Sequence, residues 1–198
     1  MKRLLISLLL LSSISSFLFA KEDVKLGFYV REGKTDLAEI KKAPTDLIVS
    51  FENTIIFDSL IEDWIKDQTE KNGKPPKVTA AGLQTEFLKS MDKLLKSGKP
   101  ISRIADKSKV TKKYVIMLNV DRIVPVPMVG HTFTCRINLY EASNLETPIS
   151  VMTLQIIESG GTIPGVVSDK GIGQAGLTIA SQLKMLIANP KAARSEKE

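Results

Sequence analysis

The chain has 198 residues, of which 43% are hydrophobic and 25% charged, and its formal net charge is +6; these are values of an ordinary globular protein. The basic residues are scattered among acids and no aromatic residues interleave the lysines, so the charge does not indicate a nucleic-acid-binding patch. Cys135 is the only cysteine, which excludes an internal disulfide and every metal site built from several cysteines.

The first twenty residues have the pattern of a secretory signal peptide. Lys2 and Arg3 precede the apolar run at 4–11, and serines and further apolar residues lead to Ala20. The whole apolar stretch is shorter and richer in serine than a spanning helix, which needs about 20 mostly apolar residues. We therefore predict that residues 1–20 are a signal peptide that is removed, with an uncleaved anchor as the alternative. The mature protein is expected to be periplasmic or secreted, without stable membrane insertion.

The segment from residue 24 to residue 57 predicts short strands. Residues 24–30 are assigned a first strand, and residues 37–42 a turn of helix that Pro44 ends. The apolar, β-branched run at 47–51 predicts a buried strand. Residues 55–57 either extend that strand or pair back on it.

Two helices follow. A capping box at Ser59-Leu-Ile-Glu62 predicts a short helix from about Leu60 to Gln68. Thr79 is the expected N-cap of a second helix over 80–96, and Gly98 suits the left-handed position beyond its end. Six apolar residues at helical spacing form its core-facing stripe: Leu83, Phe87, Leu88, Met91, Leu94 and Leu95.

Three segments with alternating apolar residues predict half-buried strands, at 114–120, 132–140 and 151–157. Pro125 places the end of the first one at a sheet edge or in a loop. The polar residues 141–148 predict a hairpin connection between the other two.

The C-terminal part predicts one more helix. A glycine-rich stretch from 160 to 176 leads into a helix over about 174–188, and the polar tail 190–198 is predicted to be disordered. The terminal helix should cover the hairpin and share its core. The elements together predict an α/β (α+β) fold, a small mixed, mainly antiparallel sheet covered by two principal helices, in a single domain over 21–189.

A glycine motif in this last region has the spacing of a dinucleotide-binding turn: Gly171, Gly173 and Gly176. That motif needs a strand immediately before it and a further strand after its helix, and the sequence offers neither. We therefore interpret these glycines as allowing a bend and close packing at the start of the helix.

His131 and Cys135 are the one histidine and the one cysteine, and their even spacing puts both on one face of a strand. A nucleophile pair is conceivable. The spacing, however, separates them by roughly 13 Å along an extended strand, and apolar residues surround the cysteine. We predict a core cysteine and a histidine in a turn. No catalytic, cofactor-binding or metal-ligating residue is assigned, and no cofactor is expected.

The order of the elements supports a resemblance to known proteins. The chain resembles small exported bacterial envelope proteins of unassigned function. The resemblance lies in the order of a signal peptide, the strand at 47–51, the helix at 80–96, the strand at 114–120, the hairpin at 133–157 and a terminal helix. The layout over about 45–188 is also similar to the compact α/β domain of curli-secretion and penicillin-binding-protein-activator lipoproteins, although the lipid-carrying cysteine is missing here. The resemblance implies protein–protein work in the envelope and carries over no functional residue.

The resulting functional hypothesis is a non-enzymatic, exported protein that binds another envelope protein or envelope component. The alternative is a small-molecule or lipid-binding module with a pocket between helix 80–96 and the sheet. The third class, an enzyme that uses His131 or a pair of acids, is the least favoured.

Overall fold

The structure is a computed structural model that describes residues 27–73, 79–96, 100–126, 130–158, 169–190 and 194–195. The predicted signal peptide, Gly98 and the start of the glycine-rich stretch lie outside these residues. In chain order the described strands are β1 (Gly27–Gly33), β2 (Thr45–Ser50), β3 (Ile55–Ile56), β4 (Ser59–Leu60), β5 (Ile101–Arg103), β6 (Tyr114–Val126), β7 (Gly130–Glu141), β8 (Ser150–Glu158) and β9 (Arg194–Ser195). The helices are α2 (Ile61–Asn72), α3 (Ala80–Lys96) and α4 (Asp169–Ala188), with short 3-10 turns at Ala38–Ile40 and Lys107–Lys109.

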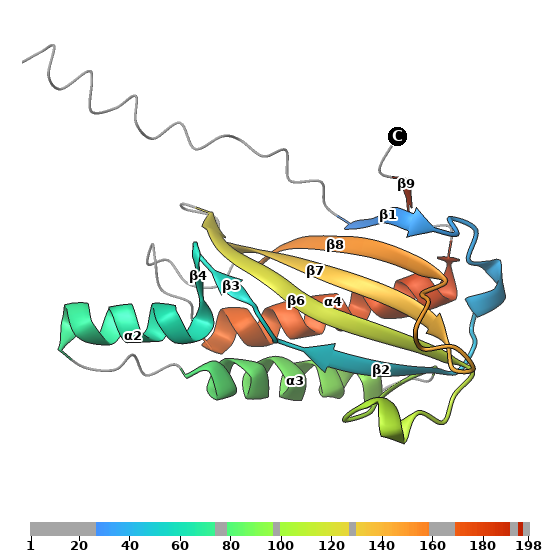
Figure 1. Ribbon diagram of the computed structural model, residues 1–198, viewed down its shortest axis with the longest axis horizontal. Helices are drawn as coiled ribbons and strands as arrows, with labels where there is room; N and C mark the ends of the chain where they lie inside the picture. The colour runs from blue at the N-terminus through green and yellow to red at the C-terminus, as the bar shows by residue number, and fades with distance from the viewer. Residues whose placement is uncertain are drawn as a thin grey trace, which may run out of the picture.

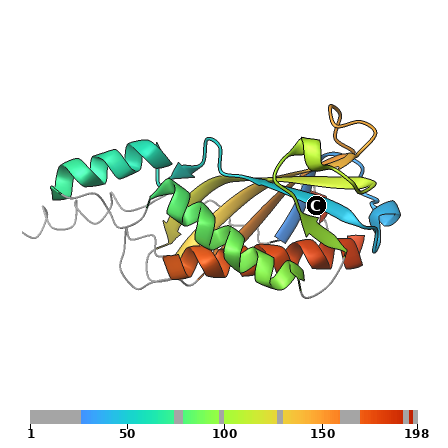
Figure 2. The same cartoon turned by 90° about the horizontal axis from the view of Figure 1, so that it is seen from below.

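The described strands form one mixed sheet in the order β4-β3-β6-β7-β8-β1-β9, and β2 also pairs with β6 and β5. The long central strands β6, β7 and β8 are antiparallel neighbours, whereas β2 and β3 run parallel to β6. Helices α3 and α4 lie side by side against one face of the sheet, and none of the described α-helices covers the opposite face (Figures 1 and 2). The predicted fold class is confirmed: the protein has an α/β (α+β) fold with a mainly antiparallel sheet and two principal covering helices.

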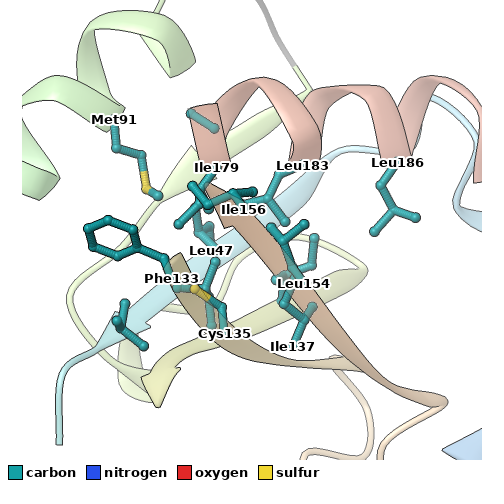
Figure 3. Packing of buried hydrophobic residues seen from close by; sticks show 14 of the residues in the cluster. Leu47, Met91, Phe133, Cys135, Ile137, Leu154, Ile156, Ile179, Leu183 and Leu186 are labelled. Carbon is teal, nitrogen blue, oxygen red and sulfur yellow. The ribbon is translucent and has the colours of Figure 1, made fainter. Parts of the chain in front are cut away.

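The core lies between the sheet and these two helices. Alternate residues of β7 and β8 point toward the helices, as the period-2 pattern predicts, and they join the buried face of α4 (Figure 3). The prediction that the terminal helix shares the core of the hairpin is confirmed, since one cluster contains residues of both: Phe133, Ile137, Leu139, Met152, Leu154, Ile156, Ile179, Leu183 and Leu186.

Helix α4 begins at Asp169, five residues before the predicted start at Gln174. Gly171, Gly173 and Gly176 therefore lie inside the helix, and the latter two face α3. A β-carbon on Gly176 would lie 2.3 Å from the carbonyl oxygen of Phe87, and one on Gly173 would lie 2.9 Å from Oγ of Ser90. The close-packing interpretation holds, but the glycines serve contact between two helices rather than a bend.

Helix α2 starts differently from the prediction. Its N-cap is Leu60, no side chain caps it, and Ser59 lies in β4, so the capping-box assignment is wrong. Ser59 instead pairs with Ile56 in a short hairpin, which takes the serine backbone out of the capping position. The helix runs to Asn72 rather than Gln68 and ends at Gly73, whose φ of 64° is left-handed.

The predicted cap of the second helix is confirmed. The backbone N–H of Gly82 donates to the Oγ1 of Thr79 at 3.0 Å, and α3 begins at the next residue, Ala80. Of the predicted stripe, four members are fully or almost fully buried and two are partly buried: Leu83, Phe87, Met91 and Leu95, and then Leu88 and Leu94.

Residues 55–56 extend the edge that β2 begins. Both β2 and β3 pair in parallel with β6, β2 along Tyr114–Asn119 and β3 along Arg122–Ile123. Between them Thr54 is buried, and its hydroxyl lies 2.6 Å from the carbonyl oxygen of Val120, next to a bulge in β6. The first of the two predicted alternatives, extension, is the one the structure shows.

The C-terminal tail differs from the prediction of disorder at two residues. Arg194 and Ser195 form β9, which pairs in parallel with Tyr29 and Val30 of β1. Pairing with β1, which is distant in the sequence, places these two residues in the sheet although their own sequence does not favour a strand.

Candidate functional site

Cys135 and His131 both lie on the core-facing side of β7. Cys135 is fully buried and belongs to the hydrophobic core, which confirms the core-cysteine prediction. Burial raises the pKa of its thiol, and the nearby Asp121 carboxylate adds to the rise. The thiolate, which is the reactive form of cysteine, is therefore disfavoured at this position.

His131 is in β7 itself and not in a turn, so that part of the prediction is wrong. The strand begins at Gly130, whose φ of 145° lets the chain enter the strand one residue before the histidine. The side chain of His131 is 4% exposed, and burial lowers its pKa. Its cross-strand partner is Glu158 of β8, which is buried as well. The structure thus places His131 beside a glutamate in register, and it leaves Cys135 opposite Leu154.

Sequence reasoning did not find the His131–Glu158 pair. The two residues are 27 positions apart, and only the register of the hairpin makes them neighbours. Among the described residues, no group of three or more histidine, cysteine, aspartate or glutamate side chains is placed to hold a metal ion.

The side of the sheet opposite α3 and α4, where no described α-helix lies, is built mainly from the central strands. We call it the helix-free face. Its residues alternate with the core residues along β6, β7 and β8: Val115, Met117, Asn119, Arg122, Val124, Thr132, Thr134, Arg136, Asn138, Tyr140, Val151, Thr153, Gln155 and Ile157. Most are half-buried, because neighbouring side chains on the same sheet face shield each other.

The composition of the helix-free face differs from that of the rest of the surface. Strands β6, β7 and β8 contain no lysine, although lysine is abundant elsewhere in the chain, and the face carries no glutamate in these strands. Its basic residues are Arg122 and Arg136. Protein–protein interfaces are typically depleted in lysine and glutamate and enriched in tyrosine, methionine and arginine.

Both arginines are paired with aspartates. Arg136 donates from a terminal guanidinium nitrogen to Oδ1 of Asp121 at 3.2 Å, and Arg122 donates to Oδ1 of Asp58 at 3.1 Å. Burial raises the pKa of the Asp121 carboxyl group, and the charge of Arg136 opposes that rise. The two ion pairs neutralise the cations of this face, which leaves little net charge to attract a polyanion.

A hollow of about 570 Å³ opens at the start of α3. It lies between the end of β2, the loop at 51–54, the start of α2 and the first turn of α3, where Ala81 and Gln84 line it. Two acidic residues, Glu52 and Glu62, also line it, and the described lining includes no basic residue. Farther along α3 the space toward the sheet is filled by core side chains such as Phe87 and Met91.

Within the described part of the chain, helices long and apolar enough to cross a membrane are absent.

Comparison with known proteins identifies no family. No family model matches the chain, and no curated protein matches it. A PelC dodecamer structure from Paraburkholderia phytofirmans is similar in fold with a TM-score of 0.39 and 12% sequence identity, over 85% of this chain and 98% of that chain. The hypothetical protein CT253 from Chlamydia trachomatis has the same TM-score and 8% identity, over 73% of this chain and 96% of that chain. The predicted resemblance to curli-secretion and penicillin-binding-protein-activator lipoproteins stays a prediction.

Proposed function

We propose that this chain is a non-enzymatic binding protein of the bacterial cell envelope, and that it binds another protein through the helix-free face of its sheet. The observation that carries the proposal is the composition of this face. The central strands contain no lysine, and this face presents Met117 and two arginines. The N-terminal pattern of a basic start and an apolar run supports export to the envelope.

The paired charges of the helix-free face favour a protein partner over a nucleic acid. Nucleic-acid binding depends on unpaired lysine and arginine side chains that neutralise phosphates. The two arginines of the helix-free face already face carboxylates, Asp58 and Asp121. Aliphatic side chains such as Val151 and Ile157 lie between the polar ones, which suits a partner surface that also mixes apolar and polar groups.

The test uses two substitutions of the same chemistry on opposite sides of the molecule. Met117 lies on the helix-free face, and Met185 is an exposed residue of α4, 45% accessible. Met117→Lys places a charge in the proposed interface, whereas Met185→Lys places one on the outer side of the helix layer. The protein would be purified from its own envelope and examined by native mass spectrometry for co-purifying proteins.

The proposal predicts that a partner protein accompanies the unchanged chain and the Met185→Lys variant and is lost from Met117→Lys. Melting curves of both variants would show that each is folded. Retention of the partner by Met117→Lys, or its loss from Met185→Lys alone, contradicts the proposal.

The hollow at the start of α3 is the feature that a second candidate, a small-molecule-binding module, would use. The acids Glu52 and Glu62 favour a cationic or neutral, hydroxyl-bearing ligand over an anionic lipid headgroup. Native mass spectrometry would reveal such a ligand as a small added mass. Ala81→Trp, which fills the hollow, should remove that mass and leave any partner protein in place.

A further inference from the structure

The β3–β4 hairpin presents apolar side chains to solvent. Ile55 and Leu60 are register partners across the hairpin, and they are 37% and 41% exposed. At its turn, Phe57 has a φ of 59°, a left-handed conformation that a bulky residue rarely adopts. The ring of Phe57 stacks on Trp64 of α2, with the ring centres 5.8 Å apart. Exposed apolar side chains that lie together, unlike scattered ones, mark contact surfaces.

Acidic residues surround this hairpin. The segment 52–72, which holds the hairpin and α2, contains six acidic residues and two lysines, so its net charge is −4 in a chain whose net charge is +6. We call this segment the acidic arm, and its helix α2 extends past the sheet at one end of the molecule (Figures 1 and 2). Two of its acids are paired, Asp58 with Arg122 and Asp67 with Lys71. The other four are exposed and form no ion pair with a described residue: Glu52, Glu62, Asp63 and Glu70.

The connection between β5 and β6 has the opposite charge. Residues 103–113, which we call the basic loop, contain one arginine, four lysines and one aspartate, a net charge of +4. Lys107 and Lys109 are exposed, and neither is ion-paired with another residue that the structure describes. The basic loop lies toward the end of the molecule away from α2 (yellow-green in Figures 1 and 2). Within one chain, therefore, the acidic arm and the basic loop do not meet.

Hydrogen bonds hold the basic loop in one conformation. The buried Asp46 of β2 accepts, through Oδ2, from the backbone N–H of Thr111 at 2.7 Å and of Lys112 at 2.9 Å. Asp106 accepts from the backbone N–H of Ser108 at 2.8 Å. Because the backbone of the loop is already ordered, binding through its lysines has to order little more than the side chains.

We propose that the acidic arm of one copy of this chain binds the basic loop of a second copy. The argument for this occupant is charge complementarity, since the two surfaces carry equal and opposite net charges and lie at opposite ends of the molecule. Because two different surfaces meet, the contact is head-to-tail rather than two-fold symmetric. The inference does not depend on the proposed function, because neither surface belongs to the central strands β6, β7 and β8.

Charge and apolar contact have separate roles in this interface. The basic loop contains two half-buried apolar residues, Ile104 and Val110, between its charged ones. They offer the exposed Ile55 and Leu60 of the hairpin an apolar surface to cover. The charges around them select the partner and its orientation, because acidic arm against acidic arm, or basic loop against basic loop, would place like charges together.

The test reverses the charge of each surface separately. The arm variant carries Glu62→Lys with Asp63→Lys, and the loop variant carries Lys107→Glu with Lys109→Glu, all at exposed positions. Each protein is purified from the envelope in the same way as the unchanged chain. Sedimentation velocity then measures the self-association of each variant alone, of the unchanged chain at low and high salt, and of an equimolar mixture of the two variants.

The unchanged chain should self-associate at low salt. Raising the ionic strength from about 0.01 M to about 1 M should dissociate it, since the distance over which exposed charges act falls from about 30 Å to about 3 Å. Each variant alone should self-associate at least about tenfold more weakly, because like charges then face each other. The mixture should associate again, because the unchanged arm of the loop variant meets the unchanged loop of the arm variant.

A matched control changes the net charge as much as the arm variant does but outside both surfaces. Glu32→Lys with Glu39→Lys, at exposed positions near β1, should leave self-association in place. Melting curves show whether each variant is folded. If the arm variant is not, Glu62→Gln with Asp63→Asn removes the same charges with a smaller change and should still weaken association.

An unchanged chain that stays monomeric at low salt overturns the proposal, as does undiminished association of either folded variant. Loss of association in both variants without recovery in the mixture also overturns it, because the two surfaces then do not bind each other. A different, basic protein that accompanies a monomeric unchanged chain and is lost from the arm variant would show that the acidic arm has another occupant, so the proposal would be wrong. Met117→Lys on β6 should leave self-association unchanged, so this test and that of the helix-free face can fail independently.

Discussion

The α-carbon of Gly176 in α4 lies so close to the backbone of Phe87 in α3 that a β-carbon there would be 2.3 Å from the Phe87 carbonyl oxygen. Real β-carbons do not approach a backbone oxygen to that distance, so the two helices can lie this close only with glycine at this position. The contact therefore sets how closely α3 and α4 approach each other.

Gly176→Ala should destabilise the protein by about 1–3 kcal/mol, because the backbone of α3 must move to admit the methyl group. Gly173→Ala should cost less, since the nearest atom there is the side-chain oxygen of Ser90. Gln174→Ala, at an exposed position of the same helix, is the control and should be neutral or slightly stabilising. Urea denaturation measures all three, and equal stability of the Gly176 and Gln174 variants would refute the close contact.

The sequence predicts a side-chain cap at both Thr79 and Ser59, whereas the structure shows one at Thr79 and none on α2. Removal of the two hydroxyl groups should therefore change stability by different amounts. Thr79→Ala should cost about 1 kcal/mol of unfolding free energy, because the Gly82 N–H loses its acceptor. Ser59→Ala should cost much less, since no side chain caps α2. The comparison of the two variants by thermal denaturation tests the corrected helix start, and a similar loss at both sites would restore the capping box.

Leu183 and Met185 are two residues apart on α4 but differ in environment. Leu183 is fully buried against the hairpin, whereas Met185 is largely exposed. Leu183→Ala should cost roughly 2–5 kcal/mol, as for a leucine in a packed core, and Met185→Ala should change stability little. Chemical denaturation distinguishes them, and a small effect at Leu183 would mean that the terminal helix is not part of the core.

The sequence predicted those features that depend on local patterns. Alternation located β7 and β8, helical spacing located α3, and a polar residue before an apolar stripe identified Thr79 as a cap. It failed where distant pairing decides the outcome: the hairpin of β3 with β4 takes Ser59 away from its capping role, and the β1 edge turns two residues of a strand-poor tail into β9. Gly173 and Gly176 lie inside α4 and face α3, a contact that their neighbours in the sequence do not reveal.

The sequence likewise predicted some features of the candidate sites and missed others. The apolar neighbours of Cys135 showed that it belongs to the core. The helix-free face was not predictable, because alternation shows that a strand has two faces and does not show which one the helices cover. The His131–Glu158 neighbourhood depends on the register of β7 with β8.

The burial of the Cys135 thiol predicts slow reaction with thiol-labelling reagents and a loss of folding stability at high pH. Burial raises the thiol pKa in the folded protein, whereas an unfolded chain has a cysteine pKa near 8.5. Below about pH 8.5 the thiol is protonated in both the folded and the unfolded chain, so its contribution to folding stability is fully present. As the pH rises further, the unfolded chain loses its proton first and the folded state loses stability. Thiol labelling of the native protein should be slow, and Cys135→Ser should cost about 1 kcal/mol or more; rapid labelling would contradict the buried position.

His131, the one histidine of the chain, predicts a loss of folding stability at low pH rather than at high pH. Burial lowers its pKa in the folded protein below the unfolded value of about 6.5. Above that value both states are neutral and the histidine does not oppose folding. As the pH falls below about 6.5, the unfolded chain takes up a proton that the folded chain resists, so stability decreases. His131→Asn should flatten the stability curve between about pH 5 and pH 6.5, where ordinary carboxyl groups are still mostly ionised. Urea denaturation midpoints of the two proteins across that range provide the measurement, and parallel curves would mean that His131 is as accessible to protons in the folded state as in the unfolded chain.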